Sequence, residues 1–148
     1  MFVSMNWIKD FVDLDGFDTE ELIQRFTLST AEVEGIEYKG RDVNGVVVGE
    51  IIQCEDHPDS DHLHVLKVDA GSEVFDVVCG APNARAGIKT AFAKVGGDVC
   101  GMKIKPAKLR GVTSNGMCCS AKEIGISDDH SGIMELDASL PNGTDIKI

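Results

Sequence analysis

The segment 54–64 brings together the side chains that bind first-row metal ions. It holds one thiol, three imidazoles and four carboxylates within eleven residues, and these groups are the usual ligands of such ions. On a strand, His62 and His64 would face the same side, but no second cluster completes a four-ligand site. The sequence therefore favours a solvated loop in which Asp59 and Asp61 accept backbone amide protons. A metal-dependent enzyme is the alternative.

Two adjacent cysteines, Cys118 and Cys119, are candidates for a catalytic nucleophile. Such a thiol needs a histidine and an acid around it, and no such pattern surrounds this pair. Adjacent side chains on a strand point to opposite faces, so we expect one thiol to be buried and the other exposed. The five cysteines include no Cys-x-x-Cys pair and are interpreted as reduced and mostly structural.

The chain lacks the glycine patterns that cradle a nucleotide phosphate. Neither Gly-x-x-x-x-Gly-Lys-Ser/Thr nor Gly-x-Gly-x-x-Gly occurs, and both motifs act by aiming backbone amides at phosphate oxygens. The sequence therefore predicts no catalytic residues, no metal and no cofactor for these 148 residues.

Basic residues are concentrated in one part of an acidic chain. Eight of the fourteen Lys and Arg residues lie between Pro82 and Lys122, a block that contains one acid, Asp98. The block carries about +7 and the remainder about −18, within a net charge of −11. A local basic surface attracts phosphates even when the whole protein repels them, so this block is the predicted nucleic-acid surface.

Within the block, basic and apolar residues alternate. Lys103 and Lys105 flank Ile104, and a strand there would present both ammonium groups on one face while burying Met102 and Ile104. Lys108 and Arg110 repeat this two-residue spacing beyond Pro106. A solvated strand face with lysines protecting an edge is the alternative. The predicted RNA-binding side chains are basic or hydrogen-bonding, with one methionine that could pack on a base: Asn83, Lys94, Lys103, Lys105, Lys108, Arg110, Ser114, Asn115, Met117 and Ser120. The only aromatic of the block is Phe92, so platforms for base stacking are scarce.

The elements that must position these residues are mostly strands. Beyond about residue 40, short runs rich in Val, Ile and Phe alternate with turn residues, which is typical of many short strands. Five or six such strands predict a small barrel. We expect one helical turn at 121–126 and a turn at 140–144 before a final strand. The predicted strands are 46–54, 63–68, 74–78, 89–94, 102–105 and 116–119.

The first 39 residues differ from the rest. Ser4 can cap a short helix, and Asp18 with Glu21 forms a capping-box pattern before a second helix. Residues 31–38 alternate imperfectly and predict a short extended segment. With three basic and nine acidic residues, this segment is not expected to face phosphates. We therefore divide the chain into an N-terminal helical or α+β segment, 1–39, and a β domain, 40–148.

The composition excludes a membrane protein. Hydrophobic residues make up 43% of the chain, enough for one ordinary core, and no apolar run approaches the length of a membrane span. Met1 is followed by no charged-then-apolar leader. We expect a soluble, cytoplasmic protein with reduced cysteines.

Five ordered motifs resemble the tRNA-binding domain that occurs in aminoacyl-tRNA synthetases and in free-standing tRNA-binding proteins. The resemblance implies an oligonucleotide/oligosaccharide-binding (OB) fold. The expected fold class is mainly β, with a five-stranded OB barrel, extra strands and a small α/β N-terminal appendage. The motifs are His57-Pro58-x-x-Asp61-x-Leu63, Val68-Asp69-x-Gly71, Val78-Cys79-Gly80-Ala81-x-Asn83, Lys105-Pro106-Ala107-Lys108-Leu109-Arg110-Gly111 and Ser114-x-Gly116-Met117-x-x-Ser120.

The N-terminal segment resembles the start of bacterial phenylalanyl-tRNA synthetase β subunits. The similarity lies in Trp7-Ile8-Lys9-Asp10-Phe11-Val12 and in Leu28-Ser29-Thr30-Ala31-Glu32-Val33-Glu34-Gly35. It implies an N-terminal part of a longer chain, in which 1–39 is half of a discontinuous domain. It also implies a synthetase that attaches phenylalanine to tRNA with ATP and magnesium, as an α2β2 tetramer with an α subunit that holds the adenylation site.

The implied partners are tRNA and the α subunit, without DNA or membrane. Two alternatives remain for the function: a structural or assembly domain of the tetramer, and a free-standing tRNA-binding protein. One departure from the family concerns His62 and His64, because family members often carry Lys and Arg there and histidine is mostly neutral at pH 7.

Overall fold

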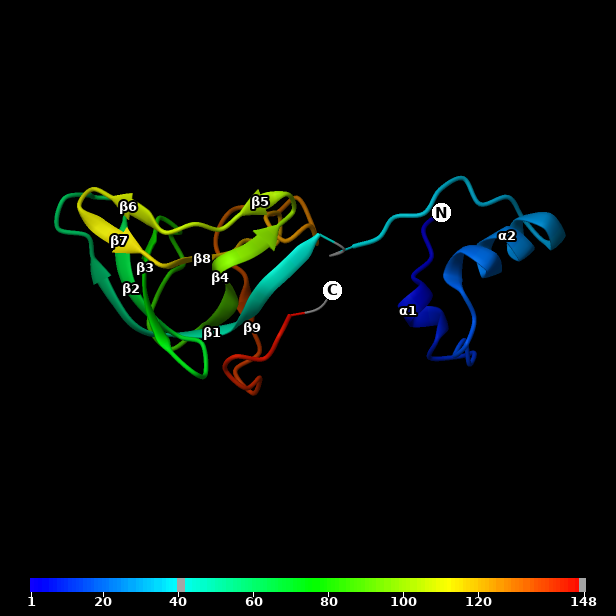
Figure 1. The fold of residues 1–148 in the computed structure, drawn as a ribbon, viewed down its shortest axis with the longest axis horizontal. Coiled ribbons are helices and arrows are strands. Elements are labelled where there is room, and N and C mark those ends of the chain that lie inside the picture. Colours follow the sequence, from blue (N-terminus) through cyan, green and yellow to red (C-terminus); the bar gives the residue numbers. More distant parts are fainter. Residues whose placement is uncertain (40–41, 147–148) are drawn as a thin grey trace. The chain divides into compact units, whose positions relative to one another are not determined.

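The structure is a computed structural model that describes residues 1–39 and 42–146. The chain forms two compact units, Met1–Glu37 and Tyr38–Ile148, which we describe separately. The first is helical and the second is built from strands (Figure 1).

The two helices of the first unit begin at their predicted caps. Helix α1 (Met5–Ile8) starts where the Ser4 hydroxyl accepts the Trp7 amide at 3.3 Å. Helix α2 (Thr19–Ser29) starts where the Asp18 carboxylate accepts the Glu21 amide at 3.0 Å. Both helix starts are thus confirmed, because a cap side chain satisfies a backbone donor that has no partner within the helix.

Two details of this unit differ from the prediction. The Glu21 carboxylate pairs with Arg25 one turn later at 3.2 Å instead of reaching back to the cap. Residues 31–38 form no strand, because an extended segment needs a neighbouring strand for its backbone groups and the unit supplies none. The described part of the unit is therefore α-helical rather than α/β.

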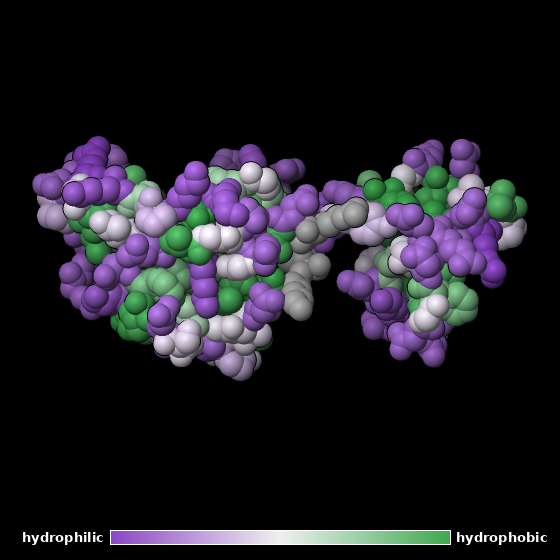
Figure 2. All heavy atoms as spheres, viewed as in Figure 1, coloured by the Kyte–Doolittle hydropathy of each residue, from purple (hydrophilic) through white to green (hydrophobic). Residues whose placement is uncertain are grey.

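Apolar side chains of this unit lie at its surface (Figure 2). No side chain of residues 1–39 is buried. Trp7, Phe11 and Leu28 are 68%, 79% and 82% exposed. The unit thus has helix caps but no buried core of its own.

The second unit consists of antiparallel strands and confirms the mainly β fold class. Within the described part of this unit, seven strands form one sheet and two form a separate hairpin. The strands are β1 (Val43–Asp56), β2 (His64–Asp69), β3 (Val74–Cys79), β4 (Lys89–Val99), β5 (Met102–Lys103), β6 (Ala107–Leu109), β7 (Val112–Ser114), β8 (Gly116–Cys118) and β9 (Glu135–Leu136).

The large sheet curls into a barrel. Its order is β3-β2-β1-β4-β5, with β8 and β9 also paired to β4. Strand β1 pairs with β4 through its first half and with β2 through its second half, and its register shifts beside both partners. At the bend, a Cβ on Gly49 would lie 2.7 Å from a Val68 methyl and 2.8 Å from the Phe92 Cβ. Only glycine lets the strands approach so closely.

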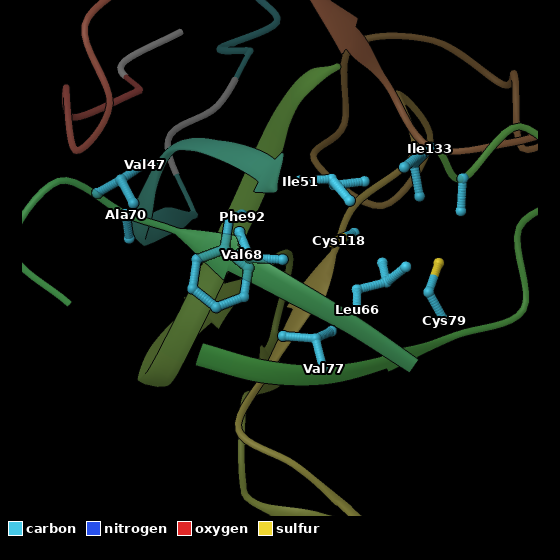
Figure 3. Close-up of a cluster of buried hydrophobic side chains, with 11 residues drawn as sticks. Val47, Ile51, Leu66, Val68, Ala70, Val77, Cys79, Phe92, Cys118 and Ile133 are labelled. Atoms are coloured by element: carbon cyan, nitrogen blue, oxygen red, sulfur yellow. The ribbon is translucent and has the colours of Figure 1, made fainter. Parts of the chain in front are cut away.

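The barrel interior is filled by alternate residues of these strands. On β2, Leu66 and Val68 are fully buried while Lys67 between them is exposed, as the period of two requires. Ile51 and Phe92 meet them from β1 and β4 in the same cluster (Figure 3). The predicted alternation is confirmed here.

The outer face of β1 and β4 is also buried. Val46, Ala91 and Ala93 point away from the barrel interior and pack with Cys119 and Ile124 of the C-terminal segment. This segment follows β8 and covers the outer face of the sheet. The face is therefore closed to a ligand.

The burial of both faces of the sheet corrects the prediction that one of the two adjacent thiols is exposed. Cys118 is 7% exposed in the inner cluster and Cys119 is fully buried in the outer cluster. Neither thiol reaches the surface, because the C-terminal segment lies where solvent was expected.

The C-terminal segment is held by turns. In the predicted helical turn at 121–126, the Gly125 amide donates to Lys122 at 3.0 Å. The predicted turn at 140–144 is present, and beyond it the Ile146 amide donates to Val46 at 2.9 Å. The rest of the predicted final strand, 147–148, lies outside the described residues.

Candidate nucleic-acid interface

Five basic residues of the predicted interface lie on β4, on β5 and the segment after it, and on the separate β6–β7 hairpin. Lys94 lies on β4 and is half-buried, Lys103 ends β5, and Lys105 follows it. Lys108 lies on β6, and Arg110 follows that strand. The last four side chains are exposed.

Most of these charges are available to a ligand. The Lys103 ammonium lies 3.8 Å from the Asp98 carboxylate. Among residues 1–39 and 42–146, Lys94, Lys105, Lys108 and Arg110 form no ion pair. Unpaired surface cations are the groups that exchange counterions for phosphates.

The prediction that Lys103 and Lys105 share one face of a strand, with Met102 and Ile104 buried, is wrong in part. Strand β5 ends at Lys103, and Met102 is 47% exposed whereas Ile104 is 6% exposed. The chain leaves the sheet at Pro106, which has no backbone N–H to donate. The basic residues are consequently spread over β5, a connecting segment and a hairpin.

The hairpin of β6 and β7 presents the last two cations. Its two-residue turn consists of Arg110 and Gly111, with φ of 48° and 88°. Two successive positive φ values are typical of the type I′ turn, whose twist matches the flanking strands. All three residues of β6 are exposed, so the side chains of Lys108 and Arg110 lie in solvent on the hairpin.

The Arg110 guanidinium is held without being neutralised. Its Nη1 donates to the backbone carbonyl of Asp59 at 2.7 Å. A carbonyl is a neutral acceptor, and a guanidinium has five N–H donors. The charge and the other donors thus stay available for a phosphate.

A shallow hollow is lined by Val95 and Pro106, which follow Lys94 and Lys105 in the chain, and by residues of β3. Its lining combines apolar side chains with carboxylates and one amide: Glu73, Val74, Phe75, Asp76, Val95, Pro106 and Asn115. Lys67 donates to Asp76 at 2.8 Å, and the Asp76 carboxylate raises the pKa of Lys67. The aromatic ring of Phe75 is half-buried.

The aromatic residue of this surface is Phe75 and not Phe92. Phe92 is fully buried and packs on Phe75, with ring centroids 5.3 Å apart, so Phe92 cannot stack on a base. The sequence reading missed Phe75 because it lies outside the basic block. Its position on an alternating strand was the available signal.

Four predicted contact residues face the protein itself. The Ser114 hydroxyl is buried between Val78 and Gly116. Ser120 and Glu123 form a reciprocal capping box with bonds of 2.6 to 3.3 Å.

Asn83 uses its amide on the backbone of Ile133, at 2.8 and 2.9 Å. The half-buried Met117 packs against the outer cluster. We therefore define the basic surface without these four residues, as Lys94, Lys103, Lys105, Lys108, Arg110 and Asn115.

The potential metal ligands of the histidine loop do not cluster. Among residues 1–39 and 42–146, no group of three or more His, Cys, Asp and Glu residues could hold an ion. His62 is exposed, and the His64 Nδ1 lies 3.3 Å from the Asp56 carboxylate. His57 alone is buried, with 4% exposure.

The buried thiols are poor nucleophiles. Burial raises the pKa of Cys119 to about 12 and that of Cys118 well above its ordinary value. A thiol attacks as thiolate. These cysteines thus stay protonated near neutral pH and serve as small core residues.

Comparison with known proteins decides the family. A model of the family described as "putative tRNA binding domain" matches residues 46–145. This range covers the strands of the barrel sheet except for the start of β1. The chain belongs to the tRNA-binding-domain family. The resemblance read from the five motifs is thus confirmed.

Curated relatives of this tRNA-binding domain are phenylalanine–tRNA ligase β subunits. The Pectobacterium atrosepticum protein is 50% identical over 143 residues, covering 95% of this chain and 18% of that protein. The Coxiella burnetii protein is 47% identical over 148 residues, covering 99% of this chain and 19% of that protein. The chain spans less than one fifth of the length of these relatives.

A solved structure supports the fold. The "MetRS related protein" of Pyrococcus horikoshii superposes with a TM-score of 0.54 at 22% identity, covering 76% of this chain and all of that chain. This similarity concerns architecture alone. Within the described ranges, no helix is long and apolar enough to cross a membrane.

Proposed function

We propose that this tRNA-binding domain binds tRNA through the basic surface. The observation that carries the proposal is the group of four cations without an ion-pair partner among the described residues, three of them exposed on or near the β6–β7 hairpin. The family and the relatives' names support tRNA as the ligand.

Binding of this kind reads the RNA backbone more than its bases. Lys and Arg contacts to phosphates give affinity and register but little sequence information. The hollow beside Phe75 offers one place for a base, since aromatic rings stack on bases of any sequence. We therefore propose a module that adds affinity and positions tRNA, with little preference of its own.

The net charge of −11 opposes this binding. Acidic residues elsewhere repel the same phosphates that the basic surface attracts. Affinity of the 148-residue chain is therefore modest and falls steeply with salt.

In the longer relatives the module would serve aminoacylation by a phenylalanine–tRNA ligase. We propose that this protein has the same role, with an α subunit as partner and ATP and magnesium as cofactors of the whole enzyme. The names of the relatives support this proposal. The 148 residues contribute tRNA binding, and the chemistry belongs to other parts of the assembly.

The exposed apolar side chains of the helical unit support a second role, in assembly. We propose that residues 1–39 form one part of a domain completed by further sequence of a longer chain. Trp7 is the single tryptophan and is 68% exposed. Its emission is expected near that of tryptophan in water in this chain and shifted to the blue in the whole subunit. Identical emission in both proteins would refute the assembly role.

Charge reversal tests tRNA binding. The double change Lys108→Glu and Arg110→Glu should lower tRNA affinity at 0.1 M salt by more than about twentyfold, since each phosphate contact is worth about fivefold there. The matched control, Lys9→Glu with Arg25→Glu, changes the net charge equally but lies in the helical unit. Equal losses in the two variants would mean that only total charge matters.

A further inference from the structure

His57 is a buried polar residue in an otherwise exposed loop. Its side chain belongs to the loop between β1 and β2, where Asp59, Asp61 and His62 are exposed, yet His57 itself is 4% exposed. Buried polar groups are retained when their hydrogen bonds are satisfied. The partners of this imidazole therefore indicate its role.

Both ring nitrogens of His57 have partners. The Asp59 amide donates to Nδ1 at 3.0 Å, so Nδ1 carries no proton. The proton then lies on Nε2, 3.1 Å from the carbonyl oxygen of Leu109, to which it donates. One neutral ring thus closes the loop's own turn and ties it to β6, 52 residues away.

A second bond runs from the hairpin back to the same loop. The Arg110 guanidinium donates to the Asp59 carbonyl at 2.7 Å. Asp59 therefore donates its amide to His57 and accepts from Arg110. Through Asp59, the hydrogen bonds link the buried imidazole to the guanidinium at the hairpin turn.

The hairpin needs such anchors. Its strands have three residues each and form a two-stranded sheet separate from the barrel sheet. An isolated two-stranded hairpin is marginally stable in water. Ser114 anchors the base of the hairpin to β3 through Val78, and the His57 loop anchors its tip.

We propose that His57 is a positioning residue of the basic surface. It touches no RNA. By fixing the tip of the β6–β7 hairpin, it holds Lys108 and Arg110 in one arrangement before tRNA arrives, so that binding loses less conformational entropy. This inference rests on the proposed tRNA binding and gives a role to the loop whose histidines and acids first suggested a metal site.

Two conservative variants separate the bonds of the ring. His57→Gln places an amide N–H near the Nε2 position and can keep the bond to Leu109. His57→Asn places an acceptor near Nδ1 and can keep the Asp59 turn, but it is too short to reach Leu109. We expect His57→Gln to stay within about twofold of the parent affinity for tRNA, and His57→Asn to lose about fivefold to twenty-five-fold at 0.1 M salt, which corresponds to one or two phosphate contacts.

A mutant cycle distinguishes positioning from a general loss of structure. In a Lys108→Ala, Arg110→Ala background, His57→Asn should change tRNA affinity by less than about twofold, because the cations that it positions are gone. Combined with Lys94→Ala, its effect should be fully additive. Full additivity in the hairpin background, or parent affinity for a folded His57→Asn protein, overturns the proposal.

A measurement on the unmodified chain keeps the proposal testable if His57→Asn does not fold. Imidazole ¹⁵N chemical shifts should show a protonated Nε2 and an unprotonated Nδ1 in the free protein. The opposite tautomer would remove the bond to Leu109 and overturn the inference. If the parent chain binds no tRNA at all, the proposed function fails, whereas binding by the parent with no effect of His57→Asn refutes the positioning role alone.

Discussion

The Ser114 hydroxyl accepts the backbone amide of Val78 at 3.0 Å and so joins the end of β7 to β3. One residue on, the Asn115 amide donates to the Asp76 carbonyl at 2.8 Å. These two bonds connect β7 and the residue after it to β3, the outer strand of the curled sheet. They close the barrel at the place where the sequence suggested RNA contacts.

Replacing Ser114 should therefore affect folding and not binding. Ser114→Ala leaves the buried Val78 amide without an acceptor, which costs about 1–3 kcal/mol. Urea unfolding should show this loss, while Ser72→Ala, at an exposed serine, should show none. A fall in the tRNA affinity of folded Ser114→Ala protein beyond about twofold would speak for a direct RNA contact.

Asn83 and Asn115 should respond in opposite ways. Asn83→Ala breaks two bonds to Ile133 and should lower the free energy of unfolding by about 2 kcal/mol. Asn115→Ala removes an amide from the hollow beside Phe75 and should lower tRNA affinity with little change in stability. Unfolding and binding curves of both variants provide the check, and the reverse pattern would contradict this assignment.

The prediction of the strands succeeded where a local sequence pattern is sufficient to locate a strand. The pattern of short runs rich in Val, Ile and Phe between turn residues located β1, β2 and β3. It ended β4 too early, at Lys94, because Gly96-Gly97 reads as a turn. In the structure β4 continues to Val99, and a Cβ on Gly45 would lie 2.9 Å from the Gly97 Cα. The glycines allow close strand crossing, which a local pattern cannot show.

The hairpin was missed for a related reason. Three-residue strands carry too few residues to show a period. The turn depends on a positive φ at Arg110, and arginine does not indicate such a turn in a sequence. Charge still located the basic surface, because clustering of Lys and Arg survives any error in strand register. Ser120 was assigned wrongly to the surface although Glu123 three residues later is a capping-box signal.

Stability should fall at acidic pH partly through Glu135. Arg85 binds both of its carboxylate oxygens at 2.8 Å, and this bonding, with Asn83, lowers the pKa of Glu135 below its ordinary value of 4.5. The stabilisation is present above pH 4.5 and is lost as pH falls through the lowered pKa.

Glu135→Gln isolates this contribution. Between about pH 5 and 3, the free energy of unfolding of the variant should depend less on pH than that of the parent. The effect is small because both side chains are half-exposed and solvent screens the pair. Parallel curves from urea unfolding across this range would contradict the assignment.

Thiol labelling should separate the cysteines by exposure. Cys100 is exposed, Cys54 is intermediate and the other three are buried. At pH 8 the native protein should show one fast-reacting thiol, absent in Cys100→Ser, and all five should react in urea. Fast labelling of Cys118 or Cys119 in native protein would contradict their burial in the inner and outer clusters.

The salt dependence of tRNA affinity tests the central claim most directly. Contacts to about four phosphates of looped RNA predict a slope near −3 in a plot of log K against log salt concentration. Replacing Lys105, Lys108 and Arg110 with alanine should reduce the slope by about 2. A flat response of the parent chain, or an unchanged slope in the triple variant, would show that the basic surface is not where tRNA binds.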